Sequence, residues 1–223
     1  MDDRLRYVAA RVRPGSVVAD IGTDHAGLPV YLVGSGICPR AVAGDVRRAP
    51  AQRALAAVQA AGLTDRIEVR VGDGLSVLRP GEATDIVLAG MGGDTIAAIL
   101  AAAPWIRDPA VRLILQPMTR PEKMRAFLLE NGFSLLEEST VASAGRRYLV
   151  TVAAYTGAAP DRREWKKYVG VLDPATEGDW LRRRAALLRA RQAGLLAAGD
   201  ADGARQAAGV AEQIERYCEG GSV

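Results

Sequence analysis

The most constraining feature of this 223-residue chain is the alternation of short apolar runs with helical segments over its first two thirds. The runs contain valine, isoleucine, leucine and alanine without regular polar alternation, as parallel strands covered on both faces require. They span residues 17–22, 41–46, 67–71, 85–90 and 111–117. The intervening segments 27–36, 49–63, 93–104 and 120–133 are long enough for helices, and this order predicts a doubly wound α/β sheet.

Two further strand-length runs, 133–140 and 146–155, follow with only the turn VASAG between them. A parallel return would need a crossover of roughly a dozen residues or more, so these strands form an antiparallel hairpin. Together with the first five runs they predict a seven-stranded, mostly parallel, Rossmann-like sheet with a terminal antiparallel hairpin. Such a sheet is more typical of class I methyltransferases than of dinucleotide-dependent dehydrogenases.

The last part of the chain lacks strand patterns. A Gly- and Pro-containing linker after Tyr155 leads to two helical segments, 176–198 and 203–219, with the turn-forming stretch AAGDADG between them. We therefore predict a Rossmann-like domain over residues 1–157 and a helical, coiled-coil-like domain over residues 158–223.

Composition narrows the class of protein. The chain is 49% hydrophobic, yet it contains no apolar run of about 18 residues or more, and its first residues are too charged for the core of a secretory signal. Two distant cysteines and one histidine do not match the spacing of a zinc site or a disulfide framework. We expect a soluble, cytoplasmic protein without metal or membrane partners, and a monomer, with a dimer as the alternative.

The turn after the first strand carries acidic residues where a phosphate-binding loop carries glycines. Asp20 and Gly22 match an acidic-x-Gly-x-Gly-x-Gly loop. Asp24 and Ala26 replace its other two glycines. A carboxylate there repels the pyrophosphate of NAD but favours S-adenosylmethionine, which carries a sulfonium and an ammonium and no phosphate. The turn therefore favours S-adenosylmethionine, and an ordinary tight turn is the alternative.

The ends of the next strands supply contacts for the rest of such a cofactor. Asp45 lies about 20 residues after Gly22, the spacing at which a carboxylate accepts hydrogen bonds from ribose hydroxyls. Asp73 follows the third strand and is suited to accept from the exocyclic amine of adenine. The fourth strand ends in a glycine-rich turn around Met91 that exposes backbone groups to a ligand. The predicted cofactor-binding residues are Asp20, Gly22, Asp24, His25, Asp45, Val46, Asp73, Gly74, Gly90, Met91 and Gly92.

In order and spacing, the chain resembles the bacterial tRNA (adenine(22)-N1)-methyltransferase family, the TrmK type. The matching segments are VADIGTDHAGLPVYL, AVAGDV, VGDGL, LAGMGGDTIAAIL, LILQPMTRPEKMRAFLLENGF and GRRYLV. The resemblance covers about residues 1–155, and its most specific part is DIGTDH combined with AGMGG. The family more often has tyrosine where Gly27 stands and, in many members, asparagine where Met118 stands.

This resemblance implies a class I methyltransferase that transfers a methyl group from S-adenosylmethionine to N1 of adenine 22 in tRNA. Asp24 and His25 are the candidate catalytic residues, as acceptors of the proton that leaves the methylated base. An equal alternative for His25 is that it satisfies a backbone group of its loop. A methyltransferase for another substrate and an RNA-binding protein that has lost catalysis are the rival functions.

Positive charge is concentrated in residues 162–191, which contain nine Lys or Arg against four acidic residues. A cluster of this kind binds phosphates without sequence preference, and a solvated helix face is the alternative. The resemblance implies that the helical extension assists tRNA binding. The predicted tRNA-binding residues are Arg162, Arg163, Lys166, Lys167, Arg182, Arg183, Arg184 and Arg189.

Overall fold

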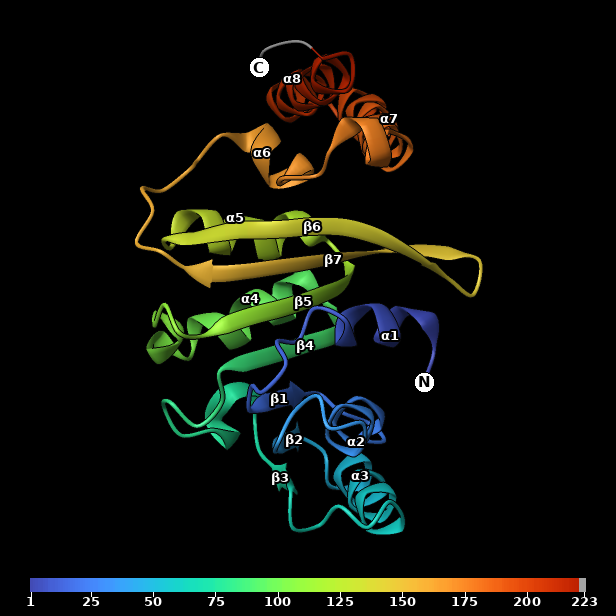
Figure 1. Cartoon of the computed structure of the whole chain (residues 1–223). Coiled ribbons are helices and arrows are strands. Elements are labelled where there is room, and N and C mark those ends of the chain that lie inside the picture. Colours follow the sequence, from blue (N-terminus) through green and yellow to red (C-terminus); the bar gives the residue numbers. More distant parts are fainter. Residues whose placement is uncertain (221–223) are drawn as a thin grey trace. The chain divides into compact units, whose positions relative to one another are not determined.

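The computed structural model describes residues 1–220 of the chain. They form two compact units, one spanning Met1–Pro160 and one that begins at Asp161 (Figure 1). The division lies within the linker that follows Tyr155. In neither unit, as far as residue 220, is any helix long and apolar enough to cross a membrane.

The first unit contains a seven-stranded sheet with the strand order β3-β2-β1-β4-β5-β7-β6 (Figure 1). Its strands are β1 (Val18–Ile21), β2 (Ala41–Asp45), β3 (Ile67–Val71), β4 (Asp85–Gly92), β5 (Arg112–Thr119), β6 (Phe133–Ser143) and β7 (Arg146–Tyr155). Strands β1 to β5 pair in parallel, and β7 lies antiparallel between β5 and β6. The predicted sheet and its terminal hairpin are confirmed.

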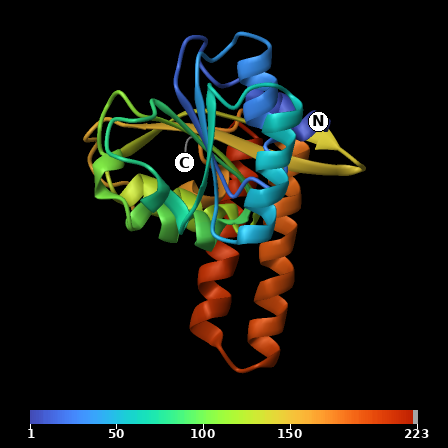
Figure 2. The same ribbon diagram turned by 90° about the horizontal axis from the view of Figure 1, so that it is seen from below.

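Helices cover both faces of this sheet (Figure 2). They are α1 (Asp3–Ala9), α2 (Gly27–Gly34), α3 (Arg48–Ala60), α4 (Gly93–Ala101) and α5 (Pro121–Glu130). One core contains Val8, Leu32 and Val58 from α1, α2 and α3, and the other contains Leu100 and Leu128 from α4 and α5. All four residues of β1 and all five of β2 are buried, which explains their continuous apolar pattern.

Helix α1 was not predicted from the sequence, because it is too short to show a helical period. Its N-terminus is capped by Asp2, whose Oδ1 accepts from the backbone N of Leu5 at 2.8 Å. Val8, near its other end, is fully buried against the sheet. Tertiary packing therefore stabilises this helix more than local propensity does.

The second unit contains α6 (Glu164–Val169), α7 (Pro174–Ala197) and α8 (Ala201–Cys218). Helices α7 and α8 lie side by side as a hairpin (Figure 2), and Leu181 of α7 and Ile214 of α8 are fully buried. Asp173 and Asp200 cap the two helices by accepting from backbone N–H groups at 2.9 Å. The predicted helical extension is confirmed, with α6 as an additional short helix.

Candidate functional site

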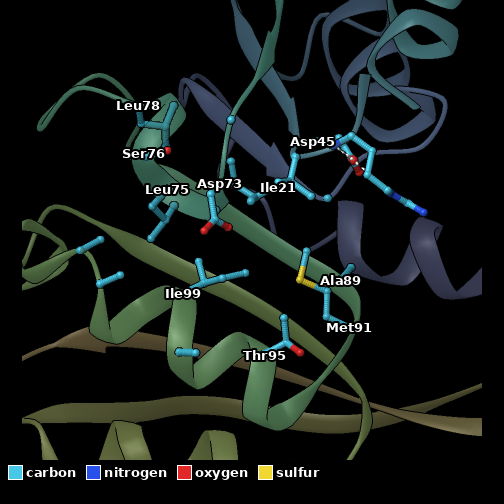
Figure 3. A pocket seen from close by; sticks show the side chains of 18 of the residues that line it. Ile21, Asp45, Asp73, Leu75, Ser76, Leu78, Ala89, Met91, Thr95 and Ile99 are labelled. Atoms are coloured by element: carbon cyan, nitrogen blue, oxygen red, sulfur yellow. Dashed lines mark hydrogen bonds and ion pairs between the residues drawn. The ribbon is translucent and has the colours of Figure 1, made fainter. Parts of the chain in front are cut away.

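A cavity of about 660 Å³ opens at the carboxyl ends of β1 to β4, where the strand order reverses (Figure 3). Its lining comes from the turns after β1, β2 and β3, the end of β4, and helix α4. Seven of the predicted cofactor-binding residues line it: Gly22, Asp45, Val46, Asp73, Gly74, Gly90 and Met91. Gly22 and Met91, which are 69 positions apart in the chain, therefore meet at one site, as expected for an open α/β sheet.

Two carboxylates lie at neighbouring strand ends in this cavity. Asp45 is only 5% exposed, and its Oδ1 accepts from the backbone N of Arg47 at 2.8 Å, which fixes its rotamer. Asp73 lies two residues after the end of β3, and its carboxylate points into the cavity (Figure 3). The pair offers acceptors for ligand hydroxyl and amine groups.

A further part of the cavity lining is apolar and was not predicted from the sequence. Leu75 and Leu78 come from the short 3₁₀ helix η1 (Gly74–Val77) and its end, and Ile99 comes from α4. Trp105, on the 3₁₀ helix η2 (Pro104–Ile106), completes this wall. A cavity that combines an apolar surface with a few carboxylates is suited to an aromatic ring that carries polar edges. Periodicity could not indicate these residues because packing, not sequence spacing, brings the short helices to the cavity.

The family of the chain follows from residues 1–151, which match the model for the methyltransferase domain. The chain belongs to this methyltransferase family. It is 40% identical over 153 residues to the tRNA (adenine(22)-N(1))-methyltransferase of Bacillus subtilis (strain 168), an alignment covering 69% of this chain and 64% of that protein. That alignment therefore spans less than two thirds of the relative's length.

Solved structures extend the likeness to both units of this methyltransferase. The crystal structure of the B. subtilis tRNA methyltransferase TrmK has a TM-score of 0.83 and 31% identity, covering 96% of each chain. A Streptococcus pneumoniae protein crystallised in complex with S-adenosyl-L-methionine has a TM-score of 0.78 and 30% identity, covering 95% of this chain and 97% of that one. The resemblance to the TrmK type is confirmed.

Asp20 lies in β1 and is not among the residues that line the cavity. The residue is 8% exposed, and burial raises the pKa of its carboxyl to about 6. A hydrogen bond with Thr23 and the charge of Arg4 oppose this rise in pKa without cancelling it. The methyltransferase therefore contains a carboxyl beneath its first turn that changes charge near pH 6.

Asp24 and His25 also lie outside the cavity lining, on the surface of the same turn. His25 Nε2 is 3.1 Å from Asp24 Oδ2, and Arg53 of α3 pairs with the other oxygen of Asp24. The hydrogen bond from Arg53 holds the pKa of Asp24 below its usual value. Their predicted catalytic role stays a prediction, because the structure places both side chains in an exposed cluster with Arg53.

Gly92, the last residue of β4, is likewise not among the residues that line the cavity. Gly27 begins α2, and Met118 on β5 is 44% exposed. The Sδ atom of Met118 lies 3.6 Å from Nε2 of Gln116, a fully buried residue that the sequence analysis did not select.

The predicted tRNA-binding residues lie in the helical unit of the methyltransferase, and at least four of them form ion pairs with described residues there. Arg163 pairs with Asp161, Lys167 with Glu164, Arg182 with Asp179, and Arg189 with Glu215, at distances from 2.6 to 3.0 Å. The guanidinium of Arg184 lies 4.4 Å from the ring centre of Trp180, and Arg162 and Arg183 are exposed. Acidic neighbours therefore offset part of the positive charge that the sequence count indicates.

Proposed function

We propose that this protein is an S-adenosylmethionine-dependent methyltransferase that modifies N1 of adenine 22 in tRNA and produces 1-methyladenosine. The observation that carries this proposal is the cavity, which combines Asp45 and Asp73 with an apolar wall at the strand ends of a methyltransferase domain. The full-length likeness to the B. subtilis tRNA methyltransferase TrmK supports tRNA as the substrate.

The residues of the cavity fit this cofactor. Asp45 would accept hydrogen bonds from the ribose hydroxyls, and Asp73 from the exocyclic amine of the adenine. Leu75 and Ile99 would contact the purine ring. The turn at Gly22 and the end of β4 at Gly90 and Met91 would surround the methionine end, near the buried carboxyl of Asp20. When bound, S-adenosylmethionine supplies an electrophilic methyl group on a sulfonium.

The chain contributes mainly positioning to such a reaction. Methyl transfer to a ring nitrogen is an in-line displacement that needs no covalent intermediate with the enzyme, so alignment of N1 with the methyl group governs the rate. Since N1 lies on the pairing edge of adenine, the enzyme must act on a base taken out of its stack. Asp24 and His25 stay the candidates to accept the proton that leaves the base.

In the helical unit, the exposed guanidinium groups of Arg162 and Arg183 support a role in contacting tRNA phosphates. Arg163, Lys167, Arg182 and Arg189 would contribute where their acidic partners exchange for phosphate, and Lys166 and Arg184 would add further positive charge. A tRNA substrate also supports the cytoplasmic location that we expect, and we expect the protein to act as a monomer.

Incubation with labelled S-adenosylmethionine and unmodified bacterial tRNA, followed by nuclease mapping, tests the proposal. We expect label in 1-methyladenosine at position 22, and no label with the Asp73→Ala variant at low cofactor concentration. Cofactor binding without methylation of tRNA would instead indicate a methyltransferase for another substrate. Salt-sensitive tRNA binding without any response to the cofactor would indicate an RNA-binding protein that has lost catalysis.

A further inference from the structure

Gln116 is a fully buried polar side chain beside the cavity, on strand β5. Its Oε1 accepts two hydrogen bonds, from the backbone N of Gly90 at 3.1 Å and from Nη1 of Arg4 at 2.6 Å. Its Nε2 donates to the carbonyl oxygen of Pro117 at 3.1 Å. The amide is therefore engaged on both sides and is held in one orientation.

The bond to Gly90 falls where the pairing of β4 with β5 is irregular. Ala89 lies opposite Gln116 and Met91 lies opposite Pro117, so Gly90 is the extra residue of a β-bulge, with φ +82°. Its N–H is turned from the sheet towards the side chain of Gln116. Because Gly90 and Met91 line the cavity, Gln116 determines where this part of the cavity wall lies.

Arg4 connects the N-terminal helix to the same point. Its side chain is 18% exposed, and besides Gln116 it reaches Oδ2 of Asp2 at 3.5 Å and lies 5.8 Å from the ring centre of Tyr148. Nη1 of Arg4 is also the atom nearest to the position that a Cβ on Gly90 would occupy, at 3.9 Å. Helix α1 is therefore connected to the bulge through Gln116, whose Oε1 accepts a charge-assisted hydrogen bond from Arg4 and a second one from Gly90.

We propose that Arg4 and Gln116 are positioning residues for methyl transfer: Gln116 holds the Gly90–Met91 bulge, and Arg4 holds Gln116. This inference rests on the proposed function. Neither residue lines the cavity, so neither is a catalytic residue in the sense of touching the cofactor or the base. Their contribution is to the alignment of the bulge with the transferred methyl group, where a displacement of about 1 Å lowers a rate by about 100-fold.

The test compares Arg4→Met with Arg6→Met, which removes the same charge from an exposed position of the same helix. Steady-state methylation of tRNA, the Kd of S-adenosylmethionine and the melting temperature are measured for each. We expect Arg4→Met to lower kcat by about 10- to 100-fold, with the Kd of the cofactor and the KM for tRNA changed less than about 3-fold. Arg6→Met should match the wild type in all three measurements.

Two further variants test the same contact. Arg4→Lys, which keeps a donor for Gln116, should recover part of kcat. Gln116→Leu, which removes the acceptor, should lower kcat as Arg4→Met does.

The outcomes separate the two proposals. An active wild type with an Arg4→Met variant that behaves like Arg6→Met would overturn the positioning role alone. So would a loss in Arg4→Met that appears as weaker cofactor binding with an unchanged kcat. A folded wild type that binds the cofactor and puts no methyl on tRNA would overturn the proposed function, and the positioning role with it.

Discussion

Nε of Arg125 donates a hydrogen bond to Oε1 of Glu138 at 2.8 Å, and neither side chain is exposed to solvent. Arg125 lies on α5 and Glu138 on β6, and Thr151 of β7 donates to the same carboxylate oxygen at 2.6 Å. This ion pair joins the terminal hairpin to the helix that covers it. A buried charge that loses its partner is much more costly than an exposed one.

Glu138→Ala should therefore lower the free energy of unfolding by about 3–5 kcal/mol, because it removes the carboxylate that pairs with the buried guanidinium of Arg125. Urea denaturation followed by circular dichroism measures the change. Glu137→Ala is the matched control, since Glu137 is the neighbouring residue and pairs with Arg11 at 2.9 Å on the surface. Glu137→Ala should lower the free energy of unfolding by less than about 1 kcal/mol. An equal decrease in the free energy of unfolding for both variants would contradict the expectation that the buried pair matters more for stability than the exposed one.

Gly22→Ala should weaken the binding of S-adenosylmethionine. Gly22 has φ +81°, and a Cβ there would overlap Cε of Met91, so the side chain of Met91 would have to move within the cavity. Gly15→Ala is the control, because Gly15 has φ +80° and no atom within 4 Å of the added Cβ. Both variants should lose roughly 1 kcal/mol of stability from backbone strain, but only Gly22→Ala should raise the Kd of the cofactor by about 10-fold or more in calorimetry. Equal Kd values for the two variants would contradict the role of the first turn.

Asp20 should make stability depend on pH. Because its folded-state pKa is raised from 3.8 to about 6, the folded protein binds a proton more readily than the unfolded chain between these values. Its contribution to stability is complete below about pH 4 and is lost as pH rises through 6. The free energy of unfolding of Asp20→Asn, relative to that of the wild type, should therefore rise by about 1 kcal/mol between pH 5 and pH 7. Urea unfolding of both proteins across this range measures the difference, and a constant difference would indicate an ordinary pKa.

Arg183→Glu should weaken tRNA binding and reduce its salt dependence. If Arg183 neutralises one phosphate, the slope of log K against log salt should fall by about 1. Arg205→Glu is the control, since it makes the same charge change in the same unit outside residues 162–191. Filter binding at several salt concentrations compares the two, with the Kd of S-adenosylmethionine expected to be unchanged. A control that loses as much affinity as Arg183→Glu would indicate a general charge effect and not a phosphate contact.

The sequence by itself determined the order and type of the main elements and the strand ends that carry Asp45 and Asp73. These features follow from local information: apolar runs for buried strands, a hairpin turn too short for a crossover, and ligand sites at the ends of parallel strands. Only the tertiary structure decided which polar residues meet. Arg4 and Gln116 are 112 positions apart, and no periodicity relates them. The exposure of Asp24 beside Arg53, and the acidic partners that offset part of the basic segment, also depend on how separate elements pack, since side-chain pairing is set by distance in space and not by spacing along the chain.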